Sequence, residues 1–312
     1  MNETMGLLMI GAMYENGGNT THRLLDGHPQ MYVYPFESQL GTRHVNDYLS
    51  SLFPVKYRWP KFALESSPQD DYADIIDEEC KVRARTPEVS KFRHVRFDLS
   101  DDERRERFVS YANEARRSRA TNVMAFFKAT FDAWGNCRRS GEERFFVGYS
   151  PIVVVDAATI LAEVAGSHFL HIVRNPWSAY ADTKKRAVPL SLGHYMLAWA
   201  TNQYYALMFR DRFPDRFHLV RIEDVMADPM RTLGEFCEKL GLRRSASLSQ
   251  PSWNGEALTE VYPWGTIRVP TPEANLATAK ELSADEIEGV RRRAAHYLDA
   301  LGYETVFSQL TG

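Results

Sequence analysis

The sequence has 312 residues, of which 44% are hydrophobic and 25% charged, and its formal net charge is −3. This composition is typical of a globular chain, and it excludes wholesale disorder and a disulfide scaffold. The slightly negative charge gives no reason to expect a nucleic acid as partner. The three cysteines are widely spaced and form no metal motif, so we expect free thiols in a reducing cytoplasm. No apolar run has the length of a membrane span.

The first predicted elements are a strand, a loop, a helix and a second strand. Met5–Met13 is an apolar run of the kind that forms a strand buried on both faces of a parallel sheet. A polar loop with two glycines follows over residues 14–21, and then a short helix that ends near residues 27–29. Met31–Phe36 is typical of a second strand. This order indicates the beginning of a βαβ unit.

Residues 41–140 interrupt that pattern. Ser100 and Glu103 have the spacing of a capping box, and residues 100–134 favour helix. The stretch is too long for a plain connection between two strands. We interpret it as a helical insertion within one α/β domain that spans residues 1–312, and we expect the insertion to cover a binding site.

Strand and helix signals alternate again after the insertion. The predicted elements are a strand at 144–148, a helix at 153–165, strands at 168–173 and 217–222 with a long helix at 189–212 between them, and helices capped by Asp228 and Ser283. The predicted fold class is therefore α/β, with a central parallel sheet flanked by helices.

The first loop has the composition of an anion site. Gly17 and Gly18 permit a close approach of the backbone, and the side chains of Asn19, Thr20 and Thr21 add hydrogen-bond donors. A helix that starts after such a loop directs its N-terminal amides and its positive dipole end at an anion. The loop is not a Walker A sequence, because GxxxxGK[ST] is absent. An ordinary tight turn between a strand and a helix would also use these residues.

A second candidate site follows the strand at 168–173. Arg174 stands at the carboxyl end of that strand, where ligands bind in open α/β sheets. An arginine can grip a phosphate with two nitrogens, and a hydroxyl from Ser178 or Thr183 on the following helix could share the phosphate. The alternative is a structural arginine that pairs with a carboxylate.

Three blocks, residues 18–37, 169–186 and 217–242, resemble the sulfotransferase family that uses 3′-phosphoadenosine 5′-phosphosulfate (PAPS). The resemblance rests on GNTTHRLLDGHPQMYVYPFE, on VRNP after a buried strand, and on VRIEDVMADPMRTLGEFCEKLGL, in this order. It implies a P-loop-like α/β fold and the transfer of a sulfuryl group from PAPS to a hydroxyl or amine of a small-molecule or carbohydrate acceptor. No metal is expected.

The resemblance also implies roles for the two candidate sites. The loop Gly17–Thr21 would hold the 5′-phosphosulfate, and Arg174 would hold the 3′-phosphate. Two departures from the family pattern stand out. The lysine or arginine usual before the loop glycine is missing, and His22, Arg23 or a residue from elsewhere would have to replace it. Asp182 stands where the family has a serine.

Further residues complete the predicted site. Glu37 follows the second strand and is the preferred general base for the acceptor hydroxyl, with His28 as a weaker candidate. In the late loop, Trp264 would stack on adenine. The remaining candidates for phosphate contacts there are Gly265, Thr266 and Arg268.

Two other functions fit the same residues. One is a nucleotide-dependent phosphotransferase, against which the missing Walker lysine counts. The other is a catalytically silent nucleotide-binding or interaction protein, which the missing loop cation and Asp182 favour. The sequence does not identify the acceptor, and it is compatible with a homo-oligomer.

Overall fold

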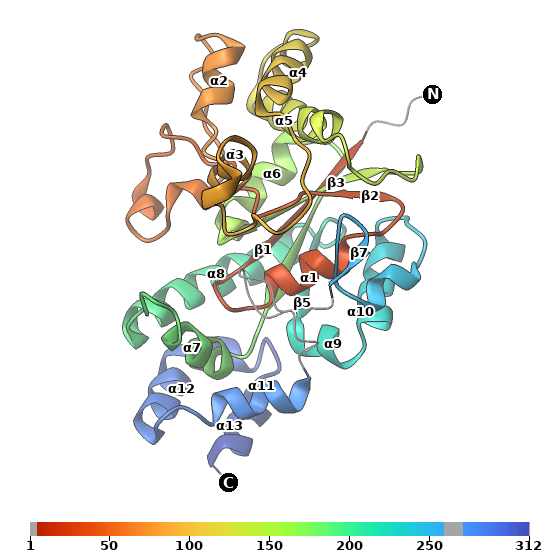
Figure 1. The fold of residues 1–312 in the computed structure, drawn as a ribbon. Helices are drawn as coiled ribbons and strands as arrows, with labels where there is room; N and C mark the ends of the chain where they lie inside the picture. The colour runs from red at the N-terminus through yellow and green to blue at the C-terminus, as the bar shows by residue number, and fades with distance from the viewer. Residues whose placement is uncertain (1–4, 259–270, 312) are drawn as a thin grey trace.

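The computed structural model describes residues 5–258 and 271–311 (Figure 1). Its centre is a five-stranded sheet with the order β2-β3-β1-β4-β5, in which every neighbouring pair is parallel. The strands are β1 Gly6–Ala12, β2 Met31–Val33, β3 Phe145–Pro151, β4 Ser167–Val173 and β5 Phe217–Arg221. The predicted α/β class with a central parallel sheet is confirmed.

Helices cover both faces of this sheet. They are α1 Gly18–Leu25, α2 Pro68–Asp74, α3 Glu78–Arg85, α4 Asp101–Asn113, α5 Arg119–Ala133, α6 Ala157–Glu163, α7 Pro176–Lys184, α8 Leu192–Arg212, α9 Ile222–Ala227, α10 Pro229–Lys239, α11 Pro272–Ala279, α12 Ala284–Leu298 and α13 Glu304–Thr311. Short 3₁₀ helices include η1 Tyr48–Ser51, η2 Val55–Tyr57 and η4 Val153–Asp156, and a small hairpin pairs β6 Ser252–Trp253 with β7 Glu256–Ala257.

Alternating residues of the central strand belong to two separate cores. Leu8 and Ile10 of β1 pack with residues of α1 and α10, whereas Leu7 and Met9 pack with residues of α5, α6 and α8. Successive side chains of a strand point to opposite faces, so a strand covered on both sides must be apolar throughout. This is why the sequence of β1 shows a continuous apolar run. Among the described residues, no helix is both long enough and apolar enough to cross a membrane.

The helices α2–α5 lie between β2 and β3 in the chain and group on one side of the molecule in Figure 1. Arg104 of α4 is fully buried at the centre of this group. Its guanidinium donates to Asp77 Oδ2 at 2.8 Å and to Asp101 Oδ1 at 2.6 Å. Asp77 also accepts from the hydroxyl of Tyr34, just after β2, at 2.8 Å. These contacts fasten the helices to the sheet, and the proposed boundaries of the insertion, 41–140, stay a prediction.

Most predicted helix starts are confirmed by their caps. Ser100 accepts from Glu103 N at 3.2 Å, Asp228 accepts from Arg231 N at 2.9 Å, and Ser283 forms a capping box with Glu286.

Several predicted elements differ in extent. The helical stretch expected at 100–134 is divided into α4 and α5, and the helix expected at 189–212 begins at Leu192. The strand expected at 31–36 has only three residues. Tyr34 N still donates to Val147 O at 2.8 Å, but Ser38 N, rather than Phe36 N, then donates to Tyr149 O at 2.6 Å. The helix expected at 153–165 begins as the 3₁₀ turn η4, and only 157–163 are α-helical.

Candidate active site

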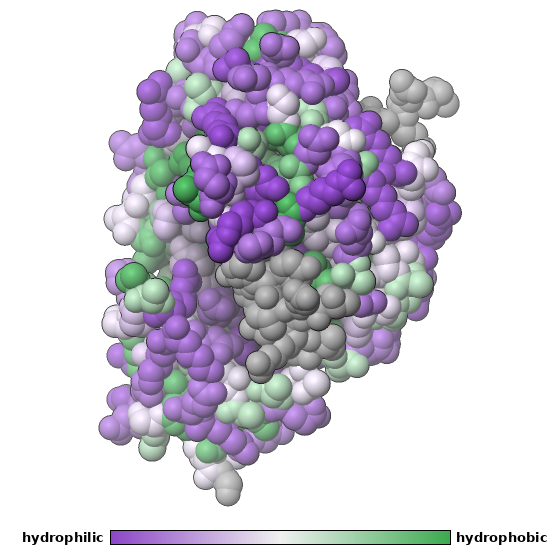
Figure 2. Space-filling view, in the orientation of Figure 1, coloured by the Kyte–Doolittle hydropathy of each residue, from purple (hydrophilic) through white to green (hydrophobic). Residues whose placement is uncertain are grey.

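A cavity of about 830 Å³ lies at the carboxyl edge of the sheet. Residues at or after the ends of all five strands contribute to its wall, as expected for a ligand site in an open parallel sheet. The lining residues are Tyr14, Glu15, Gly17, Gly18, Asn19, Thr20, Glu37, Lys56, Tyr57, Glu79, Lys91, Tyr149, Pro151, Arg174, Asp182, Lys185, Arg186, Ile222 and Met226. Most of them are polar or charged, and hydrophilic side chains predominate on the face seen in Figure 2.

The loop after β1 requires both of its glycines. Gly17 has φ +85°, and a Cβ there would lie 2.4 Å from Cγ1 of Ile222. Gly18 has an ordinary φ, but a Cβ there would lie 2.4 Å from Cε2 of Tyr149. Left-handed backbone favours glycine, and a contact of 2.4 Å leaves no room for any side chain. The backbone of this loop is therefore packed directly against neighbouring side chains.

Asn16 fixes the same loop to the rest of the site. Its side chain is fully buried and donates to Tyr14 O at 2.8 Å and to the hydroxyl of Tyr195 at 3.1 Å. Its Oδ1 accepts from the backbone N of Arg174 at 3.1 Å. One side chain thus connects the first loop to the end of β4, so the two candidate sites form one rigid edge.

Four of the five predicted loop residues, Gly17, Gly18, Asn19 and Thr20, line the cavity. The fifth, Thr21, is buried, and its hydroxyl donates back to Gly17 O at 3.1 Å. Gly17 is the N-cap of α1 and offers no side chain to its first amides. The positive end of the helix dipole therefore faces the cavity without a capping carboxylate or hydroxyl.

Arg174 lines the cavity next to this loop, and its guanidinium already has three partners. Nε donates to Asn275 Oδ1 at 2.6 Å, and Nη1 donates to Glu15 O at 2.9 Å and to Asp182 Oδ2 at 2.8 Å. Arg174 therefore lines the cavity and is also paired with a carboxylate, and its role in phosphate binding stays a prediction.

The two hydroxyls expected beside Arg174 point elsewhere. Ser178 is fully buried and donates to Asn275 O at 2.6 Å. Thr183 is fully buried and donates to Ala179 O within its own helix at 2.9 Å. Neither residue lines the cavity. Of the polar residues of α7, Asp182 is the one that does.

The cation missing from the loop is not replaced by its neighbours in sequence. His22 and Arg23 are buried, and Arg23 donates to Tyr34 O at 3.0 Å. Within residues 5–258 and 271–311, four cations from other segments line the cavity instead: Lys56, Lys91, Lys185 and Arg186. The guanidinium of Arg186 lies 4.7 Å from the ring centre of Tyr14, directly beside the loop. Sequence reasoning did not find Lys56 and Lys91, because only the tertiary fold brings them here.

Glu37 lies in the cavity wall as expected, and a second carboxylate lies beside it. Glu79 Oε2 accepts from the backbone N of Glu37 at 3.4 Å, and its other oxygen forms an ion pair with Lys91. Burial, and then the charge of Glu37, raise the pKa of Glu79 to about 7. Sequence reasoning missed Glu79. Its only signal was its place at the end of the acidic stretch 70–79, which carries no spacing that points to a site.

Tyrosines complete the wall between these carboxylates and the loop. Burial raises the pKa of Tyr14 to about 12, and burial and Glu37 raise the pKa of Tyr57 further. The rings of Tyr14 and Tyr57 meet edge to face at 6.1 Å. Their hydroxyls therefore stay protonated at neutral pH, and they can donate hydrogen bonds to a ligand.

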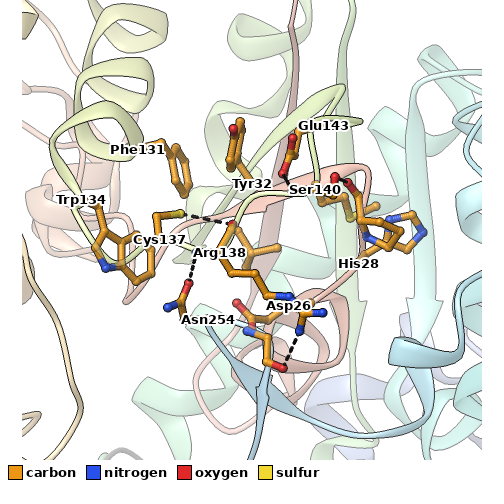
Figure 3. A pocket seen from close by; sticks show the side chains of 15 residues that line it. Asp26, His28, Tyr32, Phe131, Trp134, Cys137, Arg138, Ser140, Glu143 and Asn254 are labelled. Carbon is orange, nitrogen blue, oxygen red and sulfur yellow. Dashed lines mark hydrogen bonds between the residues drawn. The ribbon is translucent and has the colours of Figure 1, made fainter.

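His28 lies in a different place, a small cavity of about 70 Å³ beyond the carboxyl end of α1 (Figure 3). Its Nδ1 accepts from Gln30 N at 3.1 Å, and this contact assigns the proton to Nε2, which lies 3.0 Å from Arg243 O. Burial lowers the pKa of the ring. These contacts hold the ring of His28 between Gln30 and Arg243, and its candidacy as a catalytic residue stays untested. Trp264, Gly265, Thr266 and Arg268 lie outside the described residues.

A sequence profile of the sulfotransferase family matches residues 9–246 of this chain. No curated protein sequence matches the chain.

Among solved structures, the sulfotransferase domain of the olefin synthase from Synechococcus PCC 7002 is 18% identical, with a TM-score of 0.47 and coverage of 94% of this chain and 96% of that domain. The sulfotransferase domain from the curacin biosynthetic pathway is 15% identical, with a TM-score of 0.47 and coverage of 97% and 99%. Sulfotransferase STF1 from Mycobacterium tuberculosis H37Rv is 14% identical, with a TM-score of 0.45 and coverage of 95% and 78%.

Proposed function

We propose that this chain, which belongs to the sulfotransferase family, moves a sulfuryl group from PAPS to a hydroxyl or amine of a small-molecule or carbohydrate acceptor. The observation that carries the proposal is the anion cradle at the carboxyl edge of the sheet. There the uncapped start of α1 and the cations Arg174, Lys185 and Arg186 face one cavity. Anionic groups bind to such an arrangement through backbone N–H groups, the helix dipole and charge.

The residues of the cradle have distinct proposed tasks. Sulfuryl transfer resembles phosphoryl transfer, because negative charge grows on the leaving phosphate oxygen while donor and acceptor are held in line. The amides of Gly18 and Asn19 would stabilise that charge. Arg186, beside the loop, would take the place of the missing loop cation. The close packing of Gly18 against Tyr149 and Ala12 supports this role, because it fixes the position of these amides.

The acceptor side of the cavity is the proposed place of the general base. Glu37 would take the proton of the acceptor hydroxyl as oxygen attacks sulfur. Lys56, Tyr57, Glu79 and Lys91 all come from residues 41–140 and line the same cavity, which supports an acceptor-binding role for the insertion. Their charges and hydroxyls suit a polar acceptor. The three free cysteines suit the proposed cytoplasmic location.

The test is binding followed by turnover. Calorimetry with 3′-phosphoadenosine 5′-phosphate (PAP) measures donor-site affinity, and labelled PAPS with a panel of sugars, phenols and amines measures transfer. Glu37→Gln should lower turnover by about 10²–10⁴-fold and leave PAP affinity nearly unchanged, because the amide keeps the size of the side chain and cannot take a proton. A phosphotransferase would transfer phosphate from a nucleoside triphosphate instead, and a silent binding protein would bind PAP without turnover.

Glu106→Gln provides the matched control, since Glu106 is an exposed carboxylate on α4 outside the cavity. It should behave as wild type in both assays. Normal turnover in Glu37→Gln would remove Glu37 as the base, and failure of PAP to bind the wild-type chain would remove the proposed function.

A further inference from the structure

The guanidinium of Arg174 has little capacity left for a phosphate. A guanidinium grips a phosphate through two neighbouring nitrogens, either Nε with Nη2 or Nη1 with Nη2. Nε is taken by Asn275, and Nη1 is taken by Glu15 O and Asp182. Each two-nitrogen edge therefore has one nitrogen already engaged by the protein.

Asp182 already occupies the position of an anion in this part of the site. Its Oδ2 accepts from Arg174 Nη1 at 2.8 Å, and its Oδ1 lies 3.2 Å from Nζ of Lys185. Arg174, Asp182 and Lys185 all line the cavity. The carboxylate thus bridges the two cations that a phosphate at this wall would need.

No hydroxyl of α7 compensates for that carboxylate. Ser178 and Thr183 both donate to backbone carbonyls away from the cavity. Glu15 adds a second carboxylate to the same wall, and its pKa is raised by burial, with Asp182 among the further causes. A dianionic group would therefore meet two carboxylates next to the arginine expected to bind it. A neutral hydroxyl would find in Asp182 a hydrogen-bond acceptor of the kind that holds ribose hydroxyls in dinucleotide sites.

We infer that Asp182 sets donor selectivity at the ribose 3′ position, so that this protein accepts adenosine 5′-phosphosulfate, which has a free 3′-hydroxyl, at least as well as PAPS. The inference rests on the proposed function and changes only the 3′ group of the donor. The S–O bond to the phosphate oxygen breaks, a new S–O bond to the acceptor oxygen forms, and the acceptor proton passes to Glu37. The products are adenosine 5′-monophosphate (AMP) and the sulfate ester.

The experiment compares AMP and PAP as probes of the donor site by calorimetry, in wild type and in Asp182→Ser. We expect wild type to bind AMP at least as tightly as PAP. In Asp182→Ser the preference for PAP should rise at least tenfold, because Arg174 and Lys185 are freed for the 3′-phosphate. Asp182→Asn, which keeps the shape and removes the charge, should shift the preference in the same direction.

The control variant is Asp211→Ser, which removes an exposed carboxylate paired with Arg210 on α8. It should leave both affinities unchanged, and thermal unfolding checks that each variant is folded. A wild type that binds PAP more tightly than AMP, or a ratio of the two affinities that neither Asp182 variant changes by tenfold, overturns the inference and leaves the proposed function intact. If wild type binds neither nucleotide, the proposed function itself fails.

Discussion

The replacement of Gly18 by alanine tests whether the loop backbone must lie where the structure has it. The new Cβ would lie 2.4 Å from Cε2 of Tyr149 and 2.8 Å from Cβ of Ala12, whereas ordinary contacts lie at 3.4–4 Å. The new Cβ and the Tyr149 ring must thus move apart by about 1 Å to reach an ordinary contact. Tyr149 and Ala12 belong to buried central strands and cannot retreat, so the loop and the start of α1 must move.

Two magnitudes follow from that displacement. Overpacking of this kind costs about 1–3 kcal/mol of folding free energy. The reduced freedom of the unfolded chain returns about 0.4–1 kcal/mol, so a net loss of up to about 2.6 kcal/mol is expected. A misplacement of about 1 Å at a reacting group can cost about 10²-fold in turnover. Gly18 suits this test better than Gly17, since its φ is ordinary and the alanine adds no backbone strain.

Urea unfolding, PAP calorimetry and turnover with labelled PAPS measure the three effects separately. Gly193→Ala is the matched control, because Gly193 also lies in the first turn of a helix and a Cβ there meets nothing within 4 Å. That variant should be as stable as wild type or slightly more stable, with normal binding. The reasoning is refuted if Gly18→Ala keeps wild-type stability, PAP affinity and turnover within twofold.

Three other replacements have defined outcomes. Glu79 has its pKa raised from 4.5 to about 7, so its stabilising contribution is complete below pH 4.5 and is lost as pH rises through about 7. As pH rises through that window, the free energy of unfolding of Glu79→Gln, measured with urea, should therefore increase relative to that of wild type by up to about 3 kcal/mol. A difference between the two proteins that does not depend on pH would contradict the raised pKa. Arg104→Met should cost about 3–5 kcal/mol in the same assay, since Asp77 and Asp101 lose their buried partner; a loss below about 1 kcal/mol would show that the cluster is not strongly coupled. His28→Gln should keep turnover per folded molecule within twofold, because His28 does not line the large cavity, and a hundredfold loss would restore it as a catalytic candidate.

Local patterns in the sequence predicted the sheet well. The apolar runs at β1 and β4 are strands that are covered on both faces, and the caps at Ser100, Asp228 and Ser283 begin helices as expected. These features depend on neighbouring residues, so they can be recognised in a short stretch of chain. The strands are parallel, as the βαβ pattern predicts, because parallel strands need such crossovers. Their order was not predicted: β3, which follows the insertion in the chain, lies between β1 and β2.

The candidate site was predictable only where it depends on strand ends. Glu37, Arg174 and the glycine loop each follow a strand, so their common edge could be foreseen. Glu79 and Lys91 come from a segment without strands, and their positions depend on how the helices around Arg104 pack. The directions of the Ser178 and Thr183 hydroxyls depend on nearby carbonyls in the same way. Such side-chain contacts leave no periodic signal in a sequence.

Arg58 follows η2, the turn that carries Lys56 and Tyr57 into the cavity wall. Its guanidinium is buried and bonds both Asp47 and Asp156, at 2.8–3.1 Å, so the turn is fastened to the start of α6. A wall held by several charge-assisted bonds is already ordered before a ligand arrives. Binding of an acceptor that fits this wall therefore costs little free energy for ordering the protein. An acceptor that does not fit is not accommodated by a movement of the turn. Among related acceptors, affinity should therefore vary mainly through the rate of dissociation, with similar rates of association.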